Sequence, residues 1–240
     1  MAVLASRGLV RSGGLLSYPG TEPRFDPSHF AGRSLQLSGT PFGSGFINLA
    51  TGRLLTKVAS PTSKVLSSIG PTAVFAGGGV LDAWSFAGNS TNFTSSTVAA
   101  MIMFDSIATN QYIFANANNS TGLALNVNSG GTLQWTMFGV VARSASITLV
   151  ANVPYFVIAS QNPSAIDFLA MRMDNGVIVT SSTASGTPAA PNGTYQVGNG
   201  PATNQPLIGQ IAAIMFSSEY MSPQMQRRWA ADPWSFWYSR

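Results

Sequence analysis

A chain of 240 residues with 45% hydrophobic residues is long enough to bury one large core. It contains no cysteine, which excludes a disulfide framework and a thiolate metal site. Only 8% of its residues are charged, and the formal net charge is +4. The arginines are scattered and form no basic run among aromatic residues, which argues against nucleic acid as a partner. A surface so poor in charge indicates that neighbouring molecules cover much of it, or that Ser, Thr and Asn take the place of charged residues on it.

The first 45 residues keep neither a strand period nor a helix period, and they contain the breakers Pro19, Pro23 and Pro27. We therefore expect residues 1–45 to form an extended arm and a loop that leads into the folded domain at 46–240. The arm is expected to lie on a neighbouring subunit, with its arginines paired to acidic groups and its apolar residues in grooves. The assembly contacts expected in this arm are Val3, Leu4, Arg7, Leu9, Arg11 and Leu15.

No apolar run approaches the ~20 residues of a membrane span. The apolar stretch at the start of the chain is too short for the apolar region of a signal peptide. We therefore expect synthesis in the cytoplasm and no membrane partner.

From residue 46 the chain shows short strands separated by turn signals, the pattern typical of a β-sandwich. The continuous apolar run at 97–104 predicts a strand that is buried on both faces. Glycine-containing turns at 128–131 and 174–176 predict two hairpins, and the Ser/Thr/Ala/Pro-rich stretch 181–192 predicts a linker. The other expected strands are 46–53, 72–75, 80–84, 111–114, 123–127, 133–138, 146–150, 155–159, 168–173, 177–180, 195–197 and 210–216.

One helix is expected near the end of the chain. Ser222 is a suitable N-cap, Pro223 suits the first helical position, and 224–231 contains helix formers before Pro233 ends the segment. Five aromatic residues follow one another closely there, and we expect them to close the open end of the sandwich; the alternative is an exposed interface patch. They are Trp229, Trp234, Phe236, Trp237 and Tyr238.

Several segments occur in the order found in concanavalin A-like and laminin G-like domains. Asp26-Pro-Ser-His29 resembles an "NPSHPLA" opening, and Phe46-Ile-Asn-Leu-Ala-Thr-Gly-Arg53 resembles a "dlvtGr" strand. Tyr195-Gln-Val-Gly198 resembles an "lyrIG" segment, and the stretch from Met221-Ser-Pro to Asp-Pro-Trp-Ser-Phe236 resembles an "LSPaEi…nPWqlf" tail. Tails of this kind occur in laminin G-like proteins encoded by tailed bacteriophages and prophages.

The resemblance implies an all-β fold, a two-sheet antiparallel jelly-roll sandwich with an extended N-terminal arm and one short C-terminal helix. It also implies a non-enzymatic structural component of a tailed-phage virion, either a capsid decoration or a tail or fibre protein, made in the cytoplasm of a host bacterium. The expected partners are other virion proteins and further copies of the chain.

Catalytic signals are sparse. Glycoside hydrolysis needs two carboxyl groups about 5–9.5 Å apart, and no predicted strand carries acids at alternate positions. His29 is the only histidine, and no Gly-x-Ser-x-Gly motif surrounds a serine. We therefore expect no enzymatic activity and no cofactor, and a polysaccharide hydrolase is the least favoured alternative. Whether the chain binds calcium stays open. The candidate ligands are Asp82, Asp105, Asp167 and Asp174, which lack the spacing of a calcium-binding loop.

A carbohydrate-binding module or adhesin on the same fold is the alternative function. Sugar recognition combines aromatic platforms with amide side chains, and these residue types occur together in two parts of the chain. The candidate glycan-binding residues are Trp84, Tyr112, Asn116 and Asn118. Trp135 shares a predicted strand face with Leu133 and Met137, which favours a place in the core.

Overall fold

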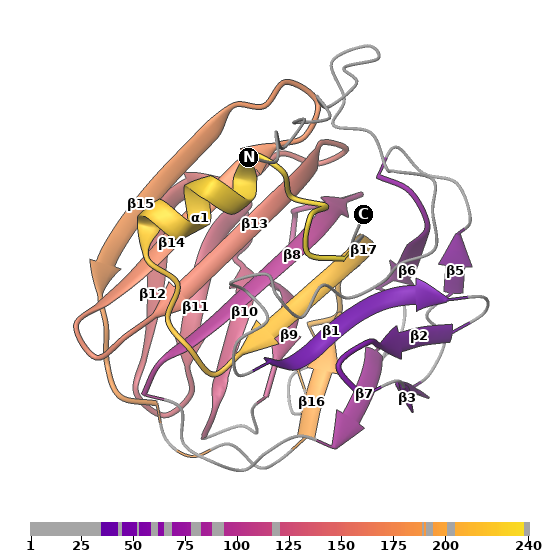
Figure 1. Cartoon of the computed structure of the whole chain (residues 1–240), viewed down its shortest axis with the longest axis horizontal. Coiled ribbons are helices and arrows are strands. Elements are labelled where there is room, and N and C mark those ends of the chain that lie inside the picture. The colour runs from indigo at the N-terminus through magenta and orange to yellow at the C-terminus, as the bar shows by residue number, and fades with distance from the viewer. Residues whose placement is uncertain are drawn as a thin grey trace, which may run out of the picture.

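The computed structural model describes residues 35–42, 45–51, 53–58, 62–64, 69–77, 83–87, 94–116, 121–188, 190, 194–200 and 205–237. These residues form two antiparallel sheets, stacked face to face, and one helix (Figure 1). The predicted all-β jelly-roll sandwich with one short C-terminal helix is therefore confirmed. Residues 1–34, with the six expected assembly contacts, lie outside the described residues.

The larger sheet has ten strands, and eight of them follow the order β15-β14-β13-β8-β17-β1-β2-β3, with β6 beside β17 and β5 beside β6. The strands are β1 (Leu35–Phe42), β2 (Gly45–Asn48), β3 (Arg53–Leu54), β5 (Thr62–Lys64), β6 (Thr72–Ala76), β8 (Ser96–Phe104), β13 (Pro154–Gln161), β14 (Ala165–Arg172), β15 (Ile178–Ala184) and β17 (Ile208–Ser217).

The smaller sheet has seven strands in the order β12-β11-β10-β9-β16-β7-β4. The strands are β4 (Thr56–Val58), β7 (Ala83–Ala87), β9 (Gln111–Ala115), β10 (Leu123–Val127), β11 (Thr132–Met137), β12 (Val141–Thr148) and β16 (Thr194–Val197).

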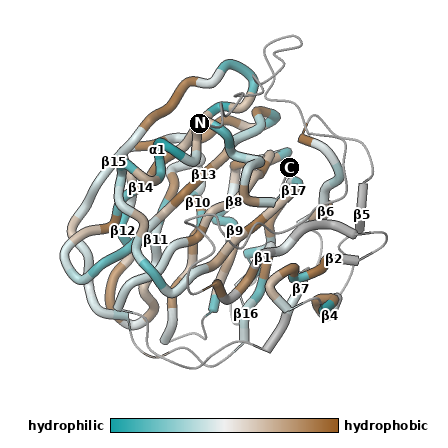
Figure 2. The backbone as a smooth tube through the Cα atoms, viewed as in Figure 1, coloured by the Kyte–Doolittle hydropathy of each residue, from teal (hydrophilic) through white to brown (hydrophobic). Residues whose placement is uncertain are grey.

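The main core lies between the two sheets. Alternate residues of β8, among them Val98 and Ile102, point into this core, and the residues between them, such as Met101, point to the other side of the ten-stranded sheet, where they are buried as well. Hydrophobic residues run along the length of β8 and β17 (Figure 2). The prediction of a strand buried on both faces at 97–104 is confirmed, because a third layer covers the outside of this sheet.

That third layer is the helix α1 (Pro223–Ala230) and the aromatic residues after it (Figure 1). Ser222 caps the helix, because its hydroxyl accepts a hydrogen bond from the Met225 N–H at 3.4 Å, and Pro223 occupies the first turn, as predicted. The Trp229 ring packs against Phe156 of β13 with centroids 5.1 Å apart. Trp229, Phe236 and Trp237 are fully buried. The aromatic residues therefore cover the outer face of the ten-stranded sheet rather than the open end of the sandwich.

Two other expectations need correction. Residues 35–42, expected in the arm, form strand β1 between β17 and β2. A bulge between Leu35 and Leu37 places Leu37 in the main core and Leu35 against the outer cluster, so the strand lacks a simple alternation in the sequence. Gly39 permits this close pairing, since a Cβ there would come within 2.3 Å of the Phe46 ring. The expected linker at 181–192 begins as strand, because β15 continues to Ala184 along β14, where pairing outweighs the modest strand preference of serine.

Both predicted hairpins are confirmed. Residues 174–176 turn between β14 and β15, and residues 128–131 turn between β10 and β11, with Gly130 and Gly131 at φ values of 102° and 83°. Among the described residues, no helix is long and apolar enough to cross a membrane.

Candidate functional site

The outer face of the seven-stranded sheet carries short polar side chains. Because side chains alternate between the two faces of a strand, the cross-strand register identifies those that point away from the core. One row crosses the sheet from Thr56 to Ala142, and a second row runs from Tyr112 to Ser144. We call this surface the amide face; it consists of Thr56, Ser85, Tyr112, Ala115, Ala124, Asn126, Gln134, Thr136, Ala142, Ser144 and Gln196.

A ladder of side-chain hydrogen bonds runs across three strands of the amide face. The Thr136 hydroxyl donates to Asn126 Oδ1 at 2.8 Å, and Asn126 Nδ2 donates to Gln134 Oε1 at 3.0 Å. Gln134 Nε2 then donates to the Ser144 hydroxyl at 2.8 Å. Each amide is thus held in one orientation while further donor and acceptor positions stay free. Gln134 and Thr136 are half-buried, and Ser144 is exposed.

Aromatic rings adjoin this ladder. Tyr112 and Phe138 stack with ring centroids 6.0 Å apart, and Tyr112 packs with the small residues Ala115 and Ala124. The register between β9 and β10 shifts at Asn126, so that Ile113 and Phe114 both point into the core while Tyr112 stays on the outer face. The bulge therefore brings Tyr112 directly opposite Asn126.

Gln196 adds an unused acceptor to the amide face. It lies on β16 opposite Ala115 and Ser85, its side chain is 8% exposed, and its Oε1 atom has no hydrogen-bond partner. A buried carbonyl oxygen without a donor is energetically unfavourable in the free protein. The oxygen is itself shielded from solvent, so it is not a contact point for a ligand on the surface.

The amide face is uncharged. The seven strands contain only two charged residues, Lys57 and Arg143, and in the register Arg143 is half-buried opposite the core residue Trp135. Within the described part of this sheet, the outward rows contain amides, hydroxyls, alanines and Tyr112.

The structure separates the residues that the sequence suggested for glycan binding. Trp84 is 3% exposed and stacks on Phe46 in the main core, which removes its ring from the surface. Tyr112 lies on the amide face but is only 6% exposed, because it packs in a small buried cluster with Ala115 and Ala124. Asn116 is fully buried at the end of β9, where its Oδ1 accepts the Leu123 N–H at 3.0 Å. Asn118 lies outside the described residues.

Sequence reasoning missed Asn126, Gln134, Thr136 and Ser144. A signal for them existed, because the turn at 128–131 sets the register of β10 against β11, and Asn126 alternates there with core residues such as Leu125 and Val127. As expected, Trp135 lies in the core, where its indole N–H bonds to Gln161 Oε1 at 2.5 Å.

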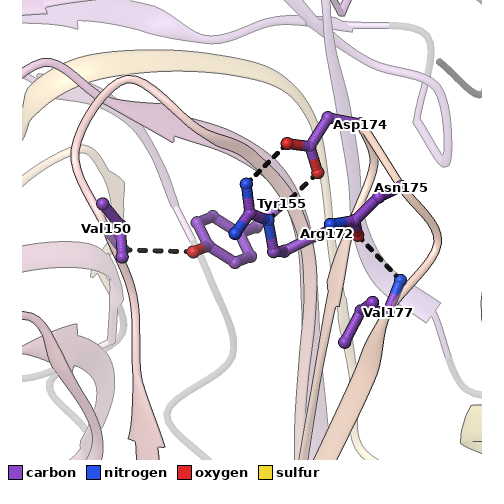
Figure 3. Close-up of polar contacts among 6 residues, drawn as sticks. All are labelled: Val150, Tyr155, Arg172, Asp174, Asn175 and Val177. Atoms are coloured by element: carbon purple, nitrogen blue, oxygen red, sulfur yellow. Dashed lines mark hydrogen bonds and ion pairs between the residues drawn. The ribbon is translucent and has the colours of Figure 1, made fainter. Parts of the chain in front are cut away.

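The acidic residues whose side-chain contacts are described act within the fold. Asp167 is 7% exposed and accepts a hydrogen bond of 2.5 Å from the Tyr220 hydroxyl. Asp174 accepts two hydrogen bonds from the Arg172 guanidinium, at 2.6 and 3.1 Å, at the turn after β14 (Figure 3). The hydrogen bond from Arg172 lowers the pKa of Asp174, and the same bond raises the pKa of Arg172.

These acids do not converge on one place. The described residues contain no cluster of three potential metal-ligating side chains, so Asp105, Asp167 and Asp174 do not fit a calcium site together. Asp82 lies outside the described residues.

Comparisons with known proteins agree with the architecture. No protein-family model and no curated protein matches the sequence. Among solved structures, the binding domain of Paraclostridial Mosquitocidal Protein 1 is 11% identical over 82% of this chain and 52% of its own, with a TM-score of 0.61. A botulinum neurotoxin type C structure is 12% identical over 85% of this chain and 52% of its own, also with a TM-score of 0.61.

A phage protein has a similar fold as well. The enzymatically active domain of bacteriophage CBA120 tailspike protein 2 is 12% identical over 74% of this chain and 29% of its own, with a TM-score of 0.55. This chain thus spans about half or less of the length of these three structures. At such identities the likeness shows a shared jelly-roll sandwich.

Proposed function

We propose that this chain is a non-enzymatic contact domain that binds carbohydrate through the amide face. The observation that carries the proposal is the hydrogen-bond ladder of Thr136, Asn126, Gln134 and Ser144 beside the half-buried ring of Phe138, which stacks on the buried ring of Tyr112. Sugars present hydroxyl groups that both donate and accept, and they also present apolar C–H faces that pack on aromatic rings. A face of amides, hydroxyls and aromatic rings matches both features.

The ladder also lowers the entropic cost of binding. A free surface glutamine loses side-chain freedom when it contacts a ligand, which costs about 0.5–1.5 kcal/mol for each immobilised side chain. Gln134 is already held between Asn126 and Ser144. Its remaining amide hydrogen and lone pair are therefore oriented before a ligand arrives.

The fold is compatible with this role. The botulinum type C toxin with a similar fold depends for its uptake into cells on two ganglioside molecules, and the similar tailspike belongs to a bacteriophage. These are properties of those proteins. A surface glycan of a host bacterium would be a suitable partner for a phage-borne domain of this kind.

The test is a glycan array that includes bacterial surface polysaccharides, probed with the wild-type chain and the variant Gln134→Ala. We expect the variant to lose about tenfold in affinity, as for the loss of one well-oriented hydrogen bond. The matched control is Gln224→Ala, the same change at an exposed position of α1 on the opposite side of the molecule. Failure of every glycan to bind, or equal losses in both variants, would reject this function.

A structural role in a tailed-phage virion is the second candidate, and an exposed apolar strand favours it. Val177, just before the edge strand β15, and Ile178 and Val179, its first two residues, are 52%, 40% and 45% exposed. Such an edge is suited to contact with another protein. The phage-like opening and tail of the sequence point the same way, and capsid decoration and tail or fibre location are both compatible with them.

Deletion of residues 1–25 tests this second role. We expect the truncated chain to fold, because β1 begins at Leu35, but to be lost from purified particles. Normal incorporation of the truncated chain would show that the arm is not an assembly contact.

A further inference from the structure

The edge strand β15 lacks the features that normally keep sheet edges apart. It ends the ten-stranded sheet, with β14 as its one strand partner among the described residues, and it lies at the margin of the molecule (Figure 1). Natural edge strands are often very short, or they carry charges, prolines or bulges that prevent pairing with another chain. In contrast, β15 runs for seven residues without a charged residue or a proline, in an unbroken register with β14.

We infer that β15 pairs with β15 of a second copy of the chain, so that the two ten-stranded sheets join into one. This inference rests on the second candidate role, in which the edge contacts another protein, and it names that protein. It is independent of carbohydrate binding by the amide face.

Alternate residues of β15 have backbone groups that point away from β14. The Arg172 N–H donates to the Val177 carbonyl at 2.9 Å, and the Ser185 N–H donates to the Ser164 carbonyl at 3.2 Å. Because hydrogen-bonded pairs alternate along an antiparallel ladder, the odd-numbered residues from 177 to 185 direct their backbone groups to β14. The N–H and C=O groups of the even-numbered residues of β15 therefore face the open edge, where one more strand can bind them.

The exposed apolar side chains lie at both ends of this edge. Val177, Ile178 and Val179 are at its start. At its end is the exposed Val140, whose Cγ1 atom lies 3.4 Å from the position that a Cβ of Gly186 would take. A second copy that runs antiparallel places the start of one β15 against the end of the other, so the apolar residues at the start approach Val140 of the other copy. The edge is thus complementary to itself about a twofold axis, which favours a second copy over a different protein.

The register of the pairing follows from the free backbone groups. All the even-numbered residues of β15 form pairs when Ile178 lies opposite Ala184, and Thr180 opposite Ser182, of the second copy. Ser181 then lies on the twofold axis opposite Ser181 of the second copy. This pair shares no hydrogen bonds, so its Cα atoms are expected about 4.5 Å apart, which is within the reach of a disulfide.

The first test is the mass of the full chain in solution, measured by light scattering after size-exclusion chromatography without any glycan. Wild type is expected at twice its chain mass of 25.1 kDa. Ile178→Lys replaces an exposed apolar residue of the edge by a charge, and it is expected to raise the dissociation constant of the dimer at least about tenfold. The matched control is Leu54→Lys, the same kind of change at an exposed residue of β3, at the opposite end of the strand order. It is expected to stay dimeric, and circular dichroism checks that both variants fold.

Single cysteines test the register, because the chain contains none. Ser181→Cys is expected to give a disulfide-linked dimer under mild oxidation. Its control is Ser182→Cys, whose two copies would be diagonal neighbours with Cα atoms about 7–8 Å apart, beyond the usual reach of a disulfide. This control is expected to cross-link much more slowly.

The outcomes separate this inference from the proposed functions. A monomeric wild type, or a dimer that Leu54→Lys weakens as much as Ile178→Lys does, would reject the pairing through β15, and equal cross-linking of the two cysteine variants would reject its register. A monomer that still enters particles would keep the second candidate role with another partner. Carbohydrate binding is judged by Gln134→Ala, a change on the other sheet that is expected to leave the mass in solution unchanged.

Discussion

The outer faces of the two sheets differ sharply, although both belong to the same sandwich. On the ten-stranded sheet the outward residues, such as Met101, Phe156 and Met215, are apolar, and the helix and aromatic tail bury them. On the seven-stranded sheet the outward residues include amides and hydroxyls, of which Thr136, Asn126, Gln134 and Ser144 are hydrogen-bonded to one another. The comparison shows that one face is a second core, whereas the other is polar and, by our proposal, serves contact with a ligand. Four predictions test this division.

The largest effect is expected where the tail meets the ten-stranded sheet. Trp229 is fully buried, contacts Phe156, Phe236 and Trp237 at centroid distances of 5.1–5.4 Å, and donates from its indole N–H to the Pro233 carbonyl at 3.2 Å. The change Trp229→Ala should lower the free energy of unfolding by about 3–5 kcal/mol, because it leaves a large cavity. Denaturant unfolding followed by circular dichroism measures it. An unchanged midpoint would contradict the second core.

The next effect is expected at Ser160, which ties the start of the tail to the sheet. Its hydroxyl lies 2.7 Å from the Thr97 hydroxyl and accepts the Met221 N–H at 2.7 Å, in a fully buried site. Ser160→Ala should lower the free energy of unfolding by about 1–3 kcal/mol, because it leaves the buried Met221 N–H without an acceptor. Ser182→Ala on the exposed side of β15 is the control, and an equal effect of the two changes would contradict the anchoring role.

A smaller, pH-dependent effect is expected at Tyr220. Burial, and then the hydrogen bond to Asp167, raise the pKa of Tyr220 from 10.0 to about 12. Because this pKa is higher in the folded state, its contribution to stability is complete below pH 10 and is lost as the pH rises toward 12 and beyond. Stability should therefore fall in that interval, and Tyr220→Phe should make the fall shallower. The measurement is the free energy of unfolding of wild type and of Tyr220→Phe between pH 9 and 12. If both proteins lost stability equally over this interval, the pKa of Tyr220 would not contribute to the pH dependence.

The smallest effect on stability is expected on the amide face. Gln134→Ala removes two half-exposed hydrogen bonds and no core contact, so the free energy of unfolding should change by less than about 1 kcal/mol. Thermal or urea unfolding of the array variants provides the measurement. A loss as large as that of Trp229→Ala would mean that the amide face is structural, and the division between the two faces would not hold.

Much of the fold could be predicted from the sequence, because its local signals agree with the tertiary structure. The helix after Ser222, the turns at 128–131 and 174–176 and the doubly buried strand at 97–104 all depend on residues close together in the chain. The strand at 35–42 was missed because its period is short, and its partner β17 lies about 175 residues away.

The site was harder to predict because a polar strand face looks like an ordinary solvated surface. Of the two aromatic residues named as glycan-binding candidates, Tyr112 lies on the outer face but is 6% exposed, and Trp84 stacks on Phe46 in the main core. Asn126, Gln134 and Ser144 come from three different strands, and only the pairing of β10, β11 and β12 brings them into one ladder.

The amino-acid sequence alone determined that this protein is a strand-rich sandwich with little charge and a capped C-terminal helix, since periodicity, turn residues and composition are local properties. The tertiary structure decided which face the aromatic tail covers and which polar residues meet. Both depend on the register between distant strands, and a shift of one residue in that register would turn the amide face into the core.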